Sequence, residues 1–235
     1  MTKRFYKTAA AIALDGGGHG VALDGRPIRT PAGRMFSVPV SALALAVAAE
    51  WAAQDSVVKP LTMPLMRLCA TAIDRIGDAR DGIVAQIAAF GASDLLSYWA
   101  EAPADLVVRQ TERWQPLLDW VAARYGARLV VTAGIVPVEQ DAATLRALHD
   151  AVDSLDDFRL AALSQLTAAC GSMVIALAAT DRHIDAAAIV AASQLDEIWQ
   201  AEQWGEDDEA AERRAALAAE IESAIRFLAL LEGTR

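Results

Sequence analysis

The residue types that most often carry out chemistry are few in this chain. Its three histidines are His19, His149 and His183. None of them lies three or four residues from another histidine or from a cysteine, which is the spacing that places two metal ligands on one face of a helix. We therefore expect no metal site.

The cysteines and serines offer no evident nucleophile. Cys69 and Cys170 lie within apolar helical patterns and far apart in sequence, so we expect two buried, reduced thiols in a reducing compartment rather than a disulfide. No serine occupies a nucleophile-elbow motif. A pair of carboxylates acting as general acid and base stays open, because 31 Asp and Glu residues allow many pairs. The sequence favours no catalytic residue and no cofactor.

The glycine cluster Gly16–Gly18 could cradle a phosphate. A phosphate loop leads directly into a helix, whose backbone N–H groups converge on the anion. Here the glycines lead into another short extended segment. A hairpin turn is therefore the favoured interpretation.

Extended segments separated by turn residues predict an antiparallel β-meander in the first forty residues. Asp24 and Gly25 form a strong hairpin signal, because both residue types tolerate positive φ angles. The predicted strands are residues 10–14, 20–23, 26–30 and 35–40.

Apolar residues at helical spacing predict helices in most of the remaining chain. In the first part, helices are expected from Ser41 to about Gln54, after a cap at Thr62, from Asp78 to Gly91, and from Pro103 to Tyr125 with a break or kink at Pro116, beside short strands at 94–99 and 128–132. From Asp141 onward all segments are expected to be helical, with caps at Asp141, Asp156 or Asp157, Ser172 and Asp185, and ends at Gly171, Gly205 and Gly233.

These elements predict an α+β fold in two domains. Residues 1–138 should form an N-terminal domain in which the small antiparallel meander packs with helices. Residues 139–235 should form an all-helical C-terminal domain.

Charge is distributed unevenly along the chain. Residues 1–80 contain ten Lys and Arg against six Asp and Glu, a net charge of +4, whereas the rest contains eleven against twenty-five, a net charge of −14. The larger part of the chain would repel phosphate groups, so we expect no nucleic-acid partner. No apolar run approaches the roughly 20 residues of a membrane-spanning helix, so we expect no membrane insertion.

Six tryptophans are the more informative feature. Burial in the core is the default for each of them, although exposed tryptophans dominate protein-binding surfaces. In the segment 194–205, which should lie within a helix from Asp185 to Gly205, Glu197 shares a face with Ala201 and Trp204. A carboxylate in that position is either a solvated charge or a contact with a partner, and the pattern alone leaves both open.

The order and spacing of several short motifs resemble the assembly chaperones of the F-type ATP synthase catalytic head. The resemblance spans nearly the whole chain. The motifs are VALDGRPIRTP at 21–31, FSVP at 36–39, AVAAEWAAQ at 46–54, TMPL at 62–65, TAID at 71–74, DLLSY at 94–98, WQPLLDW at 114–120, RYG at 124–126, GSMV at 171–174 and LDEIWQAEQWG at 195–205.

The resemblance implies a function and a set of contact residues. Such a chaperone binds the unassembled alpha subunit and shields its beta-facing interface until the beta subunit replaces it. The family carries a functional glutamate before its Trp-Gly pair, which matches Glu197, with Asp196 and Glu202 as competitors if the register slips. The partner-binding residues expected here are Glu197, Trp204, Trp51 and Glu202.

The resemblance also implies a compartment and a rival interpretation. We expect a cytoplasmic protein if it is bacterial, and a mitochondrial matrix protein if it is a processed eukaryotic chain. The free protein should be monomeric and should not be an enzyme. The alternative is a small-molecule enzyme that uses a cleft between the two domains.

Overall fold

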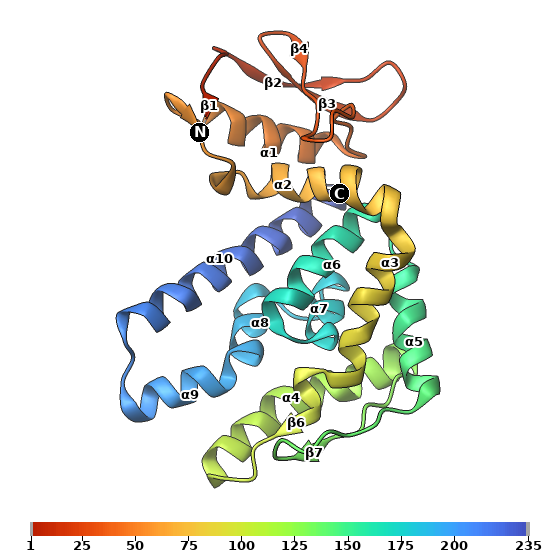
Figure 1. Ribbon diagram of the computed structural model, residues 1–235, viewed down its shortest axis with the longest axis vertical. Helices are drawn as coiled ribbons and strands as arrows, with labels where there is room; N and C mark the ends of the chain where they lie inside the picture. Colours follow the sequence, from red (N-terminus) through yellow and green to blue (C-terminus); the bar gives the residue numbers. More distant parts are fainter. Residues whose placement is uncertain (1, 234–235) are drawn as a thin grey trace. The chain divides into compact units, whose positions relative to one another are not determined.

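The computed structural model describes residues 2–233 (Figure 1). Within this range the chain forms two compact units. Unit 1 contains residues 2–80, 156–162 and 223–233, and unit 2 contains residues 81–155 and 163–222. The boundary expected after residue 138 lies inside unit 2. Because compactness does not measure independent folding, the division into domains 1–138 and 139–235 stays a prediction.

The predicted meander is present in unit 1 as a three-stranded antiparallel sheet. Its strands are β2 (Ala9–Ala13), β3 (His19–Leu23) and β4 (Arg26–Pro27), in the order β2-β3-β4. Asp24 and Gly25 both have positive φ angles, 48° and 79°, as the hairpin signal predicts.

The fourth predicted strand, residues 35–40, is wrong. Only two isolated bridges form there, Arg29 with Met35 and His19 with Val38. Pro39 has no N–H group to donate to a neighbouring strand, which limits regular pairing in this segment.

A helix, α1 (Ser41–Ala52), packs against the sheet through a buried stripe that includes Leu43 and Val47 (Figure 1). The predicted cap at Ser41 is wrong, because the N-cap residue is Val40 and no side chain caps this end. Two short strands, β1 (Thr2–Lys3) and β5 (Val57–Val58), pair antiparallel.

The second helix, α2 (Pro64–Ala70), is capped by a residue from α1. Thr62, the predicted cap, lies in a 3₁₀ turn, and the N-cap residue Met63 makes no side-chain bond. Instead the carboxylate of Glu50 accepts hydrogen bonds from the backbone N–H groups of Leu65 and Met66, each at 2.8 Å. A carboxylate at this end also complements the positive end of the helix dipole.

Asp78 does not start the third helix as predicted. The chain continues from α2 through a π-helical segment, Thr71–Ile76, into α3 (Gly77–Ala88), which is kinked at Ala79. A 3₁₀ segment, Ala89–Ser93, follows α3. The helical backbone therefore persists past Asp78, and the kink comes one residue later.

The two other predicted strands are also mostly wrong. Residues 94–99 form a 3₁₀ turn, Leu95–Ser97, followed by the short strand β6 (Tyr98–Trp99). β6 pairs parallel with β7 (Thr132–Ala133), so only Thr132 of the segment 128–132 is extended in a strand. The side chain of Gln140 bonds both the N–H and the C=O of Val130, at 2.8 and 2.9 Å, and occupies the groups that a strand would use.

The remaining chain is helical, as predicted. The helices are α4 (Ala104–Tyr125), α5 (Ala142–Asp153), α6 (Asp157–Cys170), α7 (Met173–Thr180), α8 (Ala186–Ser193), α9 (Leu195–Trp204) and α10 (Asp208–Leu231). α4 continues through Pro116, so the break considered there is wrong. The predicted α+β fold class is confirmed.

The predicted helix caps after residue 140 are confirmed. Asp141, Asp156, Ser172 and Asp185 each accept a hydrogen bond from a backbone N–H two or three residues ahead. Gly171, Gly205 and Gly233 follow helix ends with positive φ angles. Among residues 2–233, none of the helices combines the length and apolar character of a membrane span.

The centre of unit 2 is α7, all eight residues of which are buried. Its N-terminus meets the fully buried carboxylate of Asp94. This carboxylate accepts hydrogen bonds from the Ser172 hydroxyl at 2.7 Å and from three backbone N–H groups, those of Leu96, Met173 and Val174, at 3.1, 2.8 and 3.1 Å. Burial raises the pKa of Asp94, and the four donors oppose that rise.

Candidate partner-binding site

The segment around Glu197 is a separate helix, which corrects the prediction of one helix from Asp185 to Gly205. Gln194 leaves the helical conformation, with φ −113° and ψ 25°, and divides α8 from α9. The Trp114 indole N–H donates to the backbone carbonyl of Ala192 at 2.8 Å, at the end of α8. Glu197 therefore lies in the first turn of α9 and not in mid-helix.

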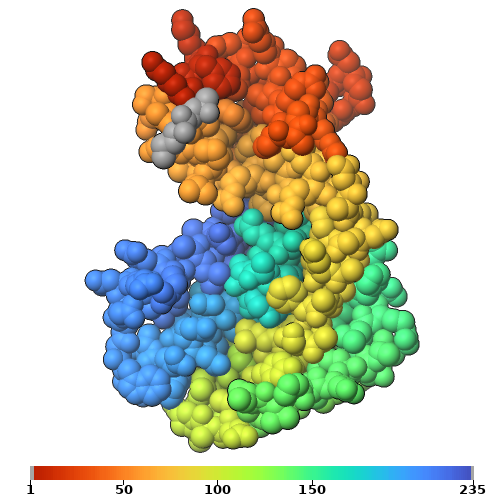
Figure 2. All heavy atoms as spheres, viewed as in Figure 1, coloured from red at the N-terminus to blue at the C-terminus, as the bar shows by residue number. Residues whose placement is uncertain are grey.

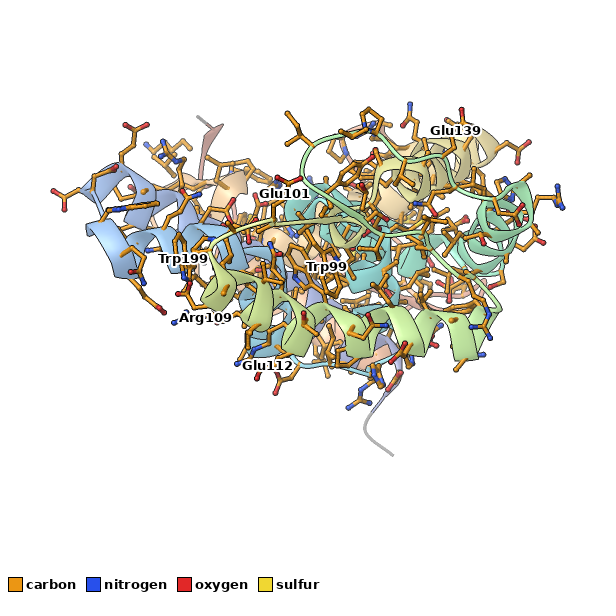
Figure 3. All side chains as sticks on the ribbon, turned by 90° about the horizontal axis from the view of Figure 1, so that it is seen from below. Trp99, Glu101, Arg109, Glu112, Glu139 and Trp199 are labelled. Atoms are coloured by element: carbon orange, nitrogen blue, oxygen red, sulfur yellow. The ribbon has the colours of Figure 1, made fainter. Side chains whose placement is uncertain are left out.

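The inner face of α9 anchors it within unit 2. Leu195 and Trp199 are buried, whereas Ile198 is half-buried. The Trp199 indole N–H donates to the carboxylate of Asp105 on α4 at 2.7 Å. Figure 3 shows Trp199 facing the first turns of α4, near Arg109. This contact holds the opposite face of α9 outward.

That outer face and the first turns of α10 enclose a hollow of about 510 Å³. Glu197, Ala201 and Trp204 line one side of it, which confirms that they share a face. Arg213 and Arg214 line the other side. Both helices lie at the molecular surface, in shades of blue in Figure 2.

Trp204 is the outstanding surface residue of this hollow. It is 75% exposed, and its ring makes an edge-to-face contact with the ring of Trp199 at a centroid distance of 5.5 Å. An exposed tryptophan is unfavourable in water, because burial of its large apolar ring lowers the free energy. The contact with Trp199 holds the ring in place without covering it.

The charged side chains around the hollow differ in whether they have a partner within the chain. Arg214 forms an ion pair with Glu206, and Arg213 pairs with Glu209 at 2.6 Å. Arg214 also approaches the backbone carbonyl of Glu197, not its carboxylate. In the part of the chain that the structure describes, the Glu197 carboxylate makes no ion pair or hydrogen bond, and the residue is exposed. It is therefore available to a partner.

The two competing acids are engaged within the molecule. Asp196 accepts a hydrogen bond from the Gln110 amide at 2.8 Å. Glu202 pairs with Arg109 on α4 at 2.6 Å and lines a different hollow on the other side of α9. The structure therefore brings Glu197 and Trp204 together and separates Glu202 from them.

Trp51 belongs to unit 1 and lines another hollow there. Its ring is half-buried and makes an edge-to-face contact with the ring of Tyr6 at a centroid distance of 5.6 Å. The Tyr6 hydroxyl donates to the Trp51 backbone carbonyl at 2.6 Å. The indole Nε1 is buried without an acceptor among residues 2–233.

A family model described as ATP12 chaperone protein matches residues 3–122. The chain belongs to the ATP12 chaperone family. The resemblance to the assembly chaperones of the F-type ATP synthase head is thereby confirmed.

Several proteins of known sequence or structure are similar to this chain. Protein atp12, mitochondrial, of Schizosaccharomyces pombe is 25% identical over 222 residues, which cover 89% of this chain and 76% of that protein. The crystal structure of Atp12 from Paracoccus denitrificans is 41% identical, with 98% of each chain covered and a TM-score of 0.92. The Atu1473 protein of Agrobacterium tumefaciens is 39% identical, with 97% of this chain and 86% of that chain covered and a TM-score of 0.91.

Replacing Trp51 with alanine in this ATP12 chain should cost about 2–4 kcal/mol of unfolding free energy. The loss is smaller than the roughly 3–5 kcal/mol of a fully buried aromatic, because the ring is only half-buried. Urea denaturation measures it. Trp114→Ala is the internal standard, since that ring is 1% exposed and should lie in the upper range. Equal losses at both positions would contradict the structural difference.

Sequence reasoning missed two buried or half-buried acids of this ATP12 chain. Glu50 and Asp94 each bind backbone N–H groups at the start of a helix. Asp94 is followed by apolar residues, and this is the one feature of the sequence that indicates its burial. Both thiols are buried and free, as predicted, and burial raises the pKa of Cys170 to about 12. Within residues 2–233 no cluster of three or more His, Cys, Asp or Glu side chains is placed to hold a metal ion.

Proposed function

We propose that this ATP12 chaperone binds the unassembled alpha subunit of the ATP synthase catalytic head. It covers the surface that alpha later turns toward beta, and beta then replaces it. The observation that carries the proposal, beside family membership, is the exposed ring of Trp204 next to the uncommitted carboxylate of Glu197 in one hollow.

The chemistry of the hollow fits a protein partner. A large aromatic ring beside a charged group is the composition of binding hot spots, where the ring supplies buried area and the charge supplies orientation. An unpaired alpha subunit exposes a surface built to meet beta, and exposed apolar surfaces of that kind associate wrongly. Glu197 and Trp204 are the proposed contacts, and Glu202 contributes by holding α9 to α4 through Arg109.

Exchange of partners requires no catalysis. A chaperone that binds alpha more weakly than beta does is displaced by mass action alone. We therefore expect purified protein to show no ATP hydrolysis above that of a heat-inactivated sample, measured by phosphate release. Turnover that disappears with one substituted residue would contradict this expectation and favour the alternative of a small-molecule enzyme.

The same proposal implies a cellular compartment and an oligomeric state. The chaperone should act where the catalytic head is assembled, in the bacterial cytoplasm or in the mitochondrial matrix. The free protein should be a monomer, since its client and not a second copy covers Trp204.

Co-expression with separate subunits tests the proposal. Alpha alone, beta alone, and each together with this chain should be expressed, and soluble subunit should be measured with the protein that co-purifies. The expected result is that the chain raises soluble alpha and co-purifies with it, while beta is unaffected. Capture of beta and not alpha, or no effect on either, would contradict the assignment.

A further inference from the structure

Unit 1 contains a second surface that the proposed role of the α9–α10 hollow does not use. It is a hollow of about 580 Å³ between the sheet and the end of α1. Phe5, Tyr6 and Trp51 form a ladder of edge-to-face rings along it, with centroid distances of 5.4 and 5.6 Å. Phe5 is 69% exposed, so the ladder begins in solvent. The volume lies within the range of pockets that hold a ligand or side chain.

Positive charge lines this aromatic hollow. Arg26 and Arg29 lie on its wall and are exposed. No ion pair of either guanidinium occurs among residues 2–233, and Arg29 makes one hydrogen bond, to the backbone carbonyl of Gly33 at 2.8 Å. Each guanidinium carries five N–H donors in one plane, an arrangement that suits a carboxylate. Most of these donors make no hydrogen bond within residues 2–233.

The single acid of this hollow is already engaged. The carboxylate of Asp24 accepts hydrogen bonds from the backbone N–H groups of Lys7 and Thr8 and from the Thr8 hydroxyl. These hydrogen bonds lower the pKa of Asp24, and the bond from the Thr8 backbone N–H has the largest effect. Asp24 therefore closes the hairpin, and the arginines beside it keep their charge for a ligand.

We propose that this hollow, lined by Phe5, Tyr6, Trp51, Arg26 and Arg29, binds an acidic segment of a partner protein that carries an aromatic or large apolar side chain. The apolar side chain enters the aromatic ladder, and the flanking carboxylates pair with the two arginines. The residues up to 80 carry a net charge of +4, which adds a longer-range attraction for such a segment. The inference does not rest on Glu197 or on alpha being the client.

A panel of fluorescent synthetic peptides tests the inference on the full chain. Each peptide carries one aromatic residue flanked by aspartates and glutamates, and a matched panel replaces every acid with lysine. Fluorescence anisotropy measures binding to the wild-type chain and to the double variant Arg26→Glu/Arg29→Glu. The control is Arg67→Glu, an exposed charge reversal elsewhere in unit 1 that does not line the hollow.

The expected result has three parts. At least one acidic peptide binds, its lysine counterpart does not, and the double variant binds it at least about tenfold more weakly, the factor that one lost charged contact gives. Added salt should weaken the binding, because the screening length falls from about 10 Å at 0.1 M to about 3 Å at 1 M. Arg67→Glu should bind as the wild type does, and circular dichroism should show all variants folded.

Three outcomes would overturn the inference. One is that no acidic peptide binds. Another is that the double variant binds as tightly as the Arg67→Glu control. The third is that the chain dimerises on size exclusion and the double variant is monomeric, which would make a second copy the occupant. Since none of these measurements involves alpha or Glu197, failure here leaves the proposed function standing.

Discussion

Replacing Asp94 with asparagine should lower the free energy of unfolding by about 1.5–4 kcal/mol. Each carboxylate oxygen of Asp94 accepts two hydrogen bonds. Oδ1 accepts from the Leu96 N–H and the Ser172 hydroxyl, and Oδ2 accepts from the Met173 and Val174 N–H groups. An asparagine amide must turn its NH₂ group toward one of these pairs. The less costly orientation faces Ser172, whose hydroxyl can turn to accept from the amide. The Leu96 N–H then loses its acceptor, at about 1–3 kcal/mol, and the end of α7 loses a charge, at about 0.3–1 kcal/mol.

The matched control is Asp185→Asn. Asp185 is also a helix cap, accepting from the Ala188 N–H at 2.8 Å, but it is exposed. Asparagine caps a helix about as well as aspartate, so this change should cost only a few tenths of a kcal/mol. Urea denaturation followed by circular dichroism measures both variants. A loss below about 1 kcal/mol at Asp94 would show that the buried cap does not hold α7.

Replacing Glu197 with glutamine should weaken binding of alpha by about 2–5 kcal/mol. The proposed partner group is a donor on alpha that becomes buried on binding, and removing the charge leaves that donor without its acceptor. The fold should survive. Because Glu197 lies in the first turn of α9, loss of its charge should cost about 0.3–1 kcal/mol through the helix dipole.

Two further variants separate a contact from a general effect of charge. Trp204→Ala should also weaken binding with little loss of stability, since the ring is 75% exposed. Glu212→Gln removes an exposed charge from α10 outside the hollow and should change neither property. Titration calorimetry with purified alpha, beside thermal melts, measures all three. If Glu197→Gln binds alpha like Glu212→Gln, the role carried over from the family resemblance is wrong at this position.

Helix caps could be predicted from the sequence where the capping residue and the N–H group it binds lie close together along the chain. The caps at Asp141, Ser172 and Asp185 were predictable because each bonds an N–H group two or three residues ahead. The cap predicted at Thr62 was wrong because Glu50 takes that role, and Glu50 lies fifteen residues before the Leu65 N–H group that it binds. Asp94 was missed for the same reason, since its partners at the N-cap and in the first turn of α7 lie 78 to 80 residues away.

The candidate site shows the same division. Helical spacing alone placed Glu197, Ala201 and Trp204 on one face, and that holds although α9 starts ten residues later than the predicted helix. Which acid is uncommitted could not be read from the sequence. That depends on Gln110 and Arg109, which come from α4 and engage Asp196 and Glu202.

The proposed exchange of partners is tested most directly by displacement. A complex of this chain with alpha should be purified, mixed with beta, and separated by size exclusion or native mass spectrometry. The expected result is that beta releases the chain in free form while an alpha–beta complex appears, without nucleotide hydrolysis. A stable assembly holding all three proteins, or a chain that beta cannot release, would contradict the proposal that the chain occupies the beta-facing surface.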